Sequence, residues 1–374
     1  MRLVLLVGLL YFVIILPTSA QDSGQPATDC EQILIQADDE FNAGRYYGIP
    51  ALLKPCLDGG FSNEQKVRAY LLLTQAYLIL DDPIAADDCY LKLLRADPEY
   101  VANPSRDPID VYYLSKKFIA TPVFTPHLRG GFNTSFVKLL YDNNTSGAPV
   151  DSKTLYRIGV QAGAGIDWNI NNHWSLCGEA NFSYKAFAQD KRTFFDADEG
   201  RYVERQNWFD FPLYIKYSDD SGKIRPFGYA GVAINLLFTA RGVNWIYTDQ
   251  FPDGSKKEAT GPTEVITYKR NKINQSLVIG GGAKYKIGRD FVYADLRYMI
   301  GVNNLANPEK IYYNQDGEFD PGISFYNDVS DFFRLDNLSI SMGYIHPIYN
   351  PRKKTKPRLK GLFKKNEPKE AGNP

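Results

Sequence analysis

The sequence has few of the residues that most often carry catalysis or bind metals: its 374 residues include four cysteines and three histidines. His127, His173 and His346 stand far apart, and the chain has no HExxH, no CxxC, no glycine-rich phosphate loop and no nucleophile elbow. We therefore expect no catalytic residue, no metal and no small-molecule cofactor. Basic and acidic residues are equal in number, at 43 each, so overall charge offers no argument for binding nucleic acid.

Long apolar runs are scarce as well. The N-terminus has one, in which Arg2 precedes a run of 14 apolar residues and Pro17 leads into short side chains up to Ala20. This pattern predicts a cleaved secretory signal over residues 1–20. A retained anchor is the alternative, but a spanning helix needs about 20 apolar residues. No later stretch has 18 consecutive apolar residues, so we predict an exported chain without a transmembrane helix.

Residues 28–97 have the periodicity of helices. Thr28 with Glu31, and Ser62 with Gln65, fit two capping boxes, and apolar residues at helical spacing follow each of them. The pattern predicts two helical hairpins about 36 residues apart, which is close to the tetratricopeptide period. The second hairpin is similar to the later part of such a repeat, although the signature Trp and Gly are absent. We predict a tetratricopeptide-like helical domain over residues 21–105.

The cysteines suggest a covalent link within this domain. Cys30 falls in the first turn of the first predicted helix and Cys56 in the last turn of the second. Antiparallel packing brings these two helix ends together, and an exported chain matures where disulfides persist. We predict a Cys30–Cys56 disulfide. Two unpaired thiols and pairing with Cys89 are the alternatives, and Cys177 is expected to be free.

The pattern changes after about residue 122, where apolar and polar side chains alternate. In WSLCGEANFSYKAF, residues 174–187, Trp, Leu, Ala, Phe and Tyr share one parity and most polar residues share the other. This alternation predicts an amphipathic strand, because successive side chains of a strand point to opposite faces. Eight such segments follow, at about residues 125–137, 155–169, 173–187, 205–218, 224–240, 270–286, 290–303 and 334–349.

Short and long connections alternate between these segments. The turns NINNH, SDDSGK and KIGRD are short, whereas the other links occupy residues 138–154, 188–204, 241–269 and 304–333. Bacterial outer-membrane barrels have this arrangement, with tight turns in the periplasm, long loops outside and an apolar face toward lipid. We predict an α+β chain, an eight-stranded antiparallel transmembrane β-barrel over residues 122–349 preceded by a small periplasmic all-α domain. A soluble sandwich or lipocalin-like protein is the alternative.

In such a barrel the polar parity of each strand faces the interior. Nine charged residues fall on this parity: Arg157, Asp167, Glu179, Lys185, Asp210, Lys216, Lys284, Asp295 and Arg297. Eight strands leave an interior just wide enough for side chains to fill it. We therefore expect ion pairs that plug the barrel, with a charge-lined conduit as the alternative.

Three stretches resemble the PorT-like outer-membrane β-barrel family of Bacteroidota. They are WFDFPLYIKY with its Pro212, RPFGYAGVAINLL, and FVYADLRYMIGV with an inward arginine. The resemblance covers roughly residues 122–349. It implies an eight-stranded outer-membrane barrel without enzymatic residues, in a family some of whose members take part in type IX secretion. The helical region and the C-terminal tail depart from the family pattern.

The two ends of the chain differ in charge. Residues 21–100 contain 14 acidic and 6 basic residues, and the tail, residues 350–374, contains 9 basic and 2 acidic ones. An even number of strands puts both ends on the periplasmic side of the outer membrane of a Gram-negative bacterium, with residues 106–121 as a linker. We expect a disordered tail. The alternatives are that the tail contacts the acidic helices, anionic lipid headgroups or a partner protein.

Three functions fit this pattern. The favoured one is a non-enzymatic barrel that anchors a periplasmic protein-interaction module in an envelope protein-transport or assembly complex, similar to type IX secretion. A small channel or porin is the second. A hydrolase or acyltransferase at the extracellular rim is the third, where Asp196, Asp198 and Glu199 stand without a histidine. Expected partners are outer-membrane lipid and a periplasmic or outer-membrane protein, and no nucleic acid.

Overall fold

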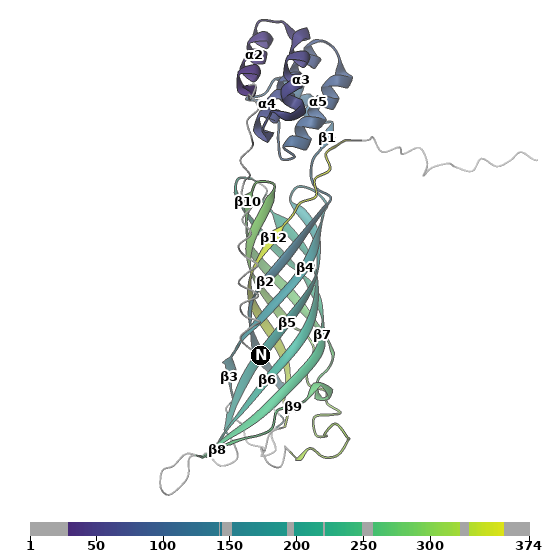
Figure 1. Ribbon diagram of the computed structural model, residues 1–374. Coiled ribbons are helices and arrows are strands. Elements are labelled where there is room, and N and C mark those ends of the chain that lie inside the picture. Colours follow the sequence, from purple (N-terminus) through teal and green to yellow (C-terminus); the bar gives the residue numbers. More distant parts are fainter. Residues whose placement is uncertain are drawn as a thin grey trace, which may run out of the picture. The chain divides into compact units, whose positions relative to one another are not determined.

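The computed structural model describes residues 29–141, 143, 152–192, 198–219, 221–248, 257–321 and 329–354. The predicted signal, residues 1–20, and the tail after Lys354 lie outside the described residues. The chain divides into two compact units. One runs to Ile119 and resumes at Arg352, and the other is Ala120–Pro351. The first is mostly helical and the second is built of strands (Figure 1).

The helical unit contains these described helices: α2 (Cys30–Asn42), η1 (Tyr46–Gly48), α3 (Ile49–Gly59), α4 (Asn63–Ile79), α5 (Pro83–Ala96) and α6 (Ile109–Ser115). Polar side chains begin three of them, because the first amides of a helix need acceptors. Asp29 accepts from the amide of Glu31 at 3.2 Å. Ser62 and Gln65 form the predicted capping box. Thr28, the other predicted cap, lies outside the described residues, and Asp29 takes the capping position of α2.

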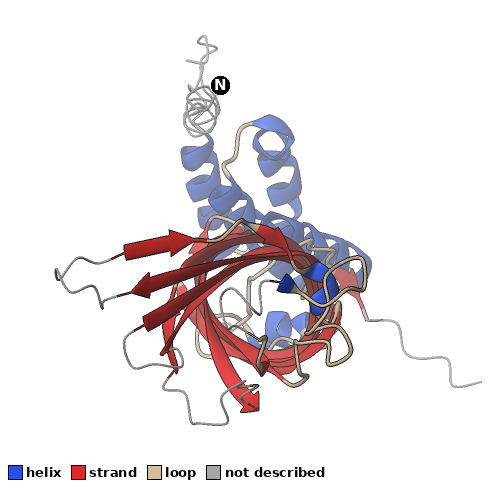
Figure 2. Ribbon diagram, turned by 90° about the horizontal axis from the view of Figure 1, so that it is seen from below, coloured by secondary structure: helices blue, strands red, loops and turns tan. Residues whose placement is uncertain are grey.

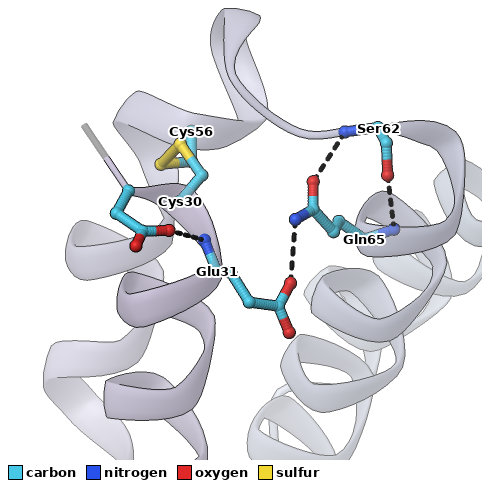
Figure 3. The surroundings of a disulfide bond; sticks show 6 residues. Cys30, Glu31, Cys56, Ser62 and Gln65 are labelled. Carbon is cyan, nitrogen blue, oxygen red and sulfur yellow. Dashed lines mark hydrogen bonds between the residues drawn. A yellow bond between two sulfur atoms is a disulfide. The ribbon is translucent and has the colours of Figure 1, made fainter. Parts of the chain in front are cut away.

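A disulfide joins the start of α2 to the end of α3. Cys30 and Cys56 are bonded, with their Cα atoms 5.8 Å apart (Figure 3). Beside this bond the Gln65 side chain donates to Glu31 at 2.8 Å, and so connects the start of α4 to the start of α2. The hydrogen bonds from Gln65 and Arg68 lower the pKa of Glu31. The starts of α2 and α4 and the end of α3 therefore lie together.

A small apolar core holds α2, α3 and α4 together. Leu34 of α2, Leu53 of α3 and Leu73 of α4 are buried in one cluster. Residues 106–121, expected to be a linker, contain α6, in which Val111 and Leu114 are buried. Among the described residues no helix is both long and apolar enough to cross a membrane.

The C-terminal segment returns to this helical unit. Strand β1 (Phe118–Ile119) pairs antiparallel with β13 (Arg352–Lys353), and the amide of Lys354 donates to the carbonyl of Lys117 at 2.7 Å. Lys353 also makes an ion pair with Asp87 of α5. The residues before and after the strands of the second unit therefore meet in one unit.

Eight long strands close into a ring in the second unit (Figures 1 and 2). They are β2 (Phe124–Tyr141), β4 (Ile158–Asn169), β5 (Trp174–Arg192), β6 (Asp198–Ser218), β7 (Ile224–Thr248), β10 (Ile273–Ile287), β11 (Asp290–Gly301) and β12 (Phe332–Ile345). Every neighbouring pair is antiparallel, and β12 pairs with β2 to complete the circle. The predicted eight-stranded antiparallel barrel is confirmed.

Short strands extend the sheet at one end of the ring. They are β3 (Ser152–Tyr156), which pairs with β5, and β8 (Lys257–Thr260) and β9 (Glu264–Val265), which pair with β7. We call this end, where β2 and β6 face their long connections, the loop end. The opposite end carries the three short turns and is called the turn end. Strand β2 begins and β12 ends at the turn end.

The two parities of the strands differ in exposure, as the alternation predicts. Phe132, Leu213, Leu296 and Ile340 point outward and are each more than half exposed. The inward parity is polar and buried, and glycines on it leave space for larger neighbours. A Cβ on Gly165 would come within 2.5 Å of His127 Nε2 and 2.7 Å of Glu179 Cγ. The interior is thus packed with side chains up to the backbone.

Candidate functional site: the charged interior of the barrel

In the part of the interior next to the turn end, Glu179 of β5 is the residue around which the other charged side chains gather. Arg297 of β11 donates to both of its carboxylate oxygens, at 2.7 and 2.9 Å. Arg129 of β2 approaches the same carboxylate at 3.1 Å, and the Tyr214 hydroxyl donates to it. Neither β11 nor β2 neighbours β5 in the ring, so the bonds from Arg297 and Arg129 to Glu179 cross the barrel. One buried carboxylate therefore ties three separate walls together.

A second carboxylate, Asp295, balances the two arginines. It lies 3.4 Å from Arg129 and accepts from the Tyr229 hydroxyl, which itself accepts from Arg297 Nε at 2.9 Å. The Arg297 guanidinium also lies over the Tyr229 ring, 5.0 Å from its centroid. Cation–π contacts and charge-assisted hydrogen bonds together offset the hydration that these charged groups lose on burial.

His127 connects this centre to a further ion pair. Its Nε2 is 3.3 Å from Glu179, and its Nδ1 is 3.5 Å from Asp167. Asp167 of β4 pairs with Lys216 of β6, across β5. The histidine thus lies between two carboxylates, each of which has its own cationic partner.

The middle of the barrel is organised around Asp210. Lys185 donates to it at 3.1 Å, and Ser183 and Asn235 donate to it at 2.5 Å each. A cavity of about 30 Å³ lies beside this cluster and is lined by Lys185, Asn235 and Trp208 among others. This volume corresponds to about two water molecules.

Glu204 and Arg270 close the interior toward the loop end. Arg270 donates to Glu204 at 2.7 and 2.9 Å, and both side chains are buried. Gln206 donates to Glu204 at 2.6 Å and accepts from Trp208 Nε1 at 2.8 Å. An apolar cluster that includes Phe187 and Leu305 packs beside them. This end of the interior is therefore also filled.

We call the ten charged residues of these clusters the inner network. It contains five cations and five anions: Arg129, Lys185, Lys216, Arg270, Arg297, Asp167, Glu179, Asp210, Glu204 and Asp295. The inner network is therefore charge-balanced. Buried pairs of this kind add little net stability, but losing one partner leaves an uncompensated charge.

The structure brings seven of the nine sequence-predicted interior residues into the inner network. Lys284 is half-buried, with its ammonium 5.3 Å from the Phe291 ring. Arg157 is exposed and lies between β3 and β4, which corrects its predicted place in the interior. Tyr156 pairs with Phe187 and Val160 pairs with Tyr184, so an advance of four residues here is opposite an advance of only three on β5. This irregularity interrupts the alternation of inward and outward side chains at Arg157.

Sequence reasoning missed three charged members of the inner network, Arg129, Glu204 and Arg270, and the histidine beside them, His127. His127 and Arg129 do alternate with outward Leu128, so parity in the first strand could have found them. Glu204 precedes the predicted start of its strand at residue 205. Arg270 begins the predicted segment 270–286 on the parity of Lys284, so parity could have found it too, although in the structure it lies in an isolated bridge to Ala306 before β10. No periodic signal in the sequence indicated that Glu204 and Arg270 pair with each other.

The remaining candidates are dispersed. Asp196 and the side chains of Asp198 and Glu199 lie outside the described residues. His173 is near the Ser218 carbonyl at 3.2 Å, and His346 lies 2.7 Å from Asp290. Within the described ranges no group of three or more His, Cys, Asp or Glu side chains is arranged to hold a metal ion.

Residues 124–307 match the family model described as "Outer membrane protein beta-barrel domain". Among solved structures, Neisserial surface protein A is similar over 60% of this chain and 97% of its own, at 11% identity and a TM-score of 0.28. OprG from Pseudomonas aeruginosa is similar over 63% and 99%, at 11% identity and a TM-score of 0.31. The outer membrane protease OmpT from Escherichia coli is similar over 60% and 96%, at 11% identity and a TM-score of 0.29. No curated protein matches the chain.

Proposed function

We propose that this chain is a bacterial outer-membrane β-barrel protein, since residues 124–307 match the outer membrane protein beta-barrel domain family, and that its barrel is a closed anchor for a protein-interaction module. The outward apolar parity is in contact with outer-membrane lipid. The helical unit is the module, and it acts on the periplasmic side. The barrel itself has no enzymatic role and carries no cofactor.

The filled interior is the observation that carries the proposal. Cross-barrel bonds such as Arg297–Glu179, and the Arg270–Glu204 pair toward the loop end, occupy the space that a pore needs. The cavity between these levels is about 30 Å³. Over the residues that the structure describes, we expect a barrel with this interior to hold a protein in the membrane and to pass no solute.

The proposed compartment rests on where the chain enters and leaves the ring. Strand β2 starts and β12 ends at the turn end, which faces the periplasm in barrels of this type. The pairing of β1 with β13 joins the flanking segments in the helical unit. These positions support the proposal that the segments before and after the barrel lie in the periplasm.

The helical unit suits a binding role. In this proposal the two hairpins, α2–α3 and α4–α5, act as a tetratricopeptide-like pair, because grooves between such helices bind segments of other proteins. Large apolar side chains are exposed on it, with Tyr47 at 87% and Ile84 at 82%. The PorT-like resemblance favours an envelope protein-transport or assembly complex, similar to type IX secretion, as the site of this binding.

The proposal is tested by deleting residues 21–105 and purifying the barrel from detergent-solubilised envelopes. We expect an inserted, heat-modifiable barrel that no longer co-purifies with the proteins bound to the full chain. The matched control is the full chain with exposed Lys223 changed to Gln, which should retain those proteins. Retention of the same partners by the deletion variant would move the binding surface to the barrel and overturn the proposal.

A further inference from the structure

One end of the helical unit gathers apolar and acidic side chains. Because α2 and α4 start beside the disulfide, both hairpin connections, residues 43–48 and 80–82, lie at the opposite end. We call it the hairpin end. Tyr47 is 87% exposed, Ile84 is 82% exposed and Ile79 is 53% exposed. Exposed Asp38, Asp39, Asp81 and Asp82 belong to the same end.

The charge of this surface restricts what can cover it. Four exposed carboxylates beside exposed Tyr and Ile repel an anionic lipid surface and attract a segment that is both cationic and apolar. Arg45, the nearby cation, is already bonded to Glu40 at 2.5 and 2.8 Å. The occupant must therefore supply its own positive charge.

The chain carries such a segment directly after Lys354. Residues 355–365, TKPRLKGLFKK, contain five cations and no acid, with Leu359, Leu362 and Phe363 between them. Their starting point is already held on the helical unit, because β13 pairs with β1 and Lys353 pairs with Asp87. Asp87 is one turn of α5 beyond Ile84, about 4.5 Å along the helix axis. Its other oxygen, Oδ1, is buried without a hydrogen-bond partner among the described residues.

We propose that residues 355–365 dock in cis on the hairpin end of the helical unit. Leu359, Leu362 and Phe363 cover Tyr47, Ile79 and Ile84, and the lysines and arginine of the segment meet the surrounding carboxylates. The tail is then an internal ligand of the surface that the proposed function gives to a partner. The docking itself does not depend on that function, so the two are judged by separate experiments.

Cysteine cross-linking of the full chain in lipid nanodiscs tests the docking. The background is Cys89→Ala/Cys177→Ala, which keeps the Cys30–Cys56 bond. Ile84→Cys is combined with Leu362→Cys, and a short bis-maleimide is added. We expect an intramolecular cross-link to form at least tenfold faster than in the matched pair Asn63→Cys/Leu362→Cys.

The control position lies within the same reach. Asn63 is exposed and begins α4, roughly 25 Å from the hairpin end. Eight residues from Lys354 to Leu362 extend to about 26 Å, so a free tail would react at both positions. Adding Asp38→Lys/Asp81→Asn should slow the Ile84→Cys reaction at least fivefold, because it removes the charge that attracts the tail.

Three outcomes would overturn the proposal. Equal rates at Ile84→Cys and Asn63→Cys mean a freely moving tail. Cross-links that form only between two chains mean that a second copy is the occupant. Loss of both reactions in nanodiscs with phosphatidylglycerol, but not in purely zwitterionic ones, means that the tail binds anionic lipid.

Discussion

Arg297 and Glu179 form a two-point ion pair, at 2.7 and 2.9 Å, that crosses the inside of the barrel from β11 to β5. The two strands are not neighbours in the sheet, and the residues are separated by 118 positions in the sequence. The pair therefore acts as a brace between opposite walls and depends on ring closure.

Removing one partner of this brace should destabilise the barrel. We expect Arg297→Leu to lower the free energy of unfolding by about 3–5 kcal/mol, because Glu179 then loses its bidentate partner while buried. All four tryptophans lie in the barrel, so urea unfolding in lipid followed by tryptophan fluorescence measures it. Arg297→Leu/Glu179→Leu should recover most of the loss. A double variant as unstable as the single one would contradict this explanation.

Gly165 should tolerate no side chain. Gly165→Ala puts a methyl group against His127 and Glu179, and we expect a loss of about 1–3 kcal/mol in the same unfolding assay. Gly178→Ala on the adjacent strand is the matched control, because a Cβ there meets nothing within 4 Å. Similar losses in both variants would mean that strand flexibility, and not interior space, sets the effect.

The intact barrel should not conduct ions. We expect no stable conductance in planar bilayers from the full chain, since the inner network fills the interior at several levels. Glu204→Ala/Arg270→Ala removes the inner-network pair nearest the loop end and should increase brief openings. A steady open channel from the unmodified chain would favour the porin alternative over the closed anchor.

The Cys30–Cys56 bond should stabilise the helical unit by about 3 kcal/mol, as expected for a link across 26 residues. Cys30→Ser/Cys56→Ser should therefore lose its helical circular dichroism at lower temperature than the parent. Cys89→Ala keeps the bond and serves as the control. Equal melting of the parent and the double variant would show that the core in α2, α3 and α4 suffices without the bond.

Cys89 should react slowly with alkylating agents in the folded chain. Burial raises the pKa of its thiol to about 11, from an ordinary value near 9. The reactive thiolate is therefore scarce at pH 8, and alkylation by iodoacetamide should be roughly 100-fold slower than at an exposed cysteine such as Asn63→Cys. The rate should increase as pH approaches 11. Mass spectrometry of the Cys89 peptide measures it, and equal rates at pH 8 would contradict the burial.

Much of the barrel could be predicted from the sequence because the alternation of apolar and polar side chains is a local property of each strand. The alternation around Phe182 and Leu213 reports which face of each strand meets lipid, and a single strand already contains that information. The same parity identified Asp167, Glu179 and Asp295 as interior residues. It misplaced Arg157, because the break between β3 and β4 interrupts the alternation without any periodic signal.

The alternation of apolar and polar residues and the sorting of short and long connections are properties of the sequence by itself, and they determined an eight-stranded outer-membrane barrel after a helical region. Which charges pair is a property of the tertiary structure alone. Glu179 meets Arg297 and Arg129 only because the sheet closes and its strands are staggered, which brings walls from distant parts of the chain within hydrogen-bonding distance. The meeting of β13 with β1 has the same origin, since closure returns the end of the chain to the place where the barrel begins.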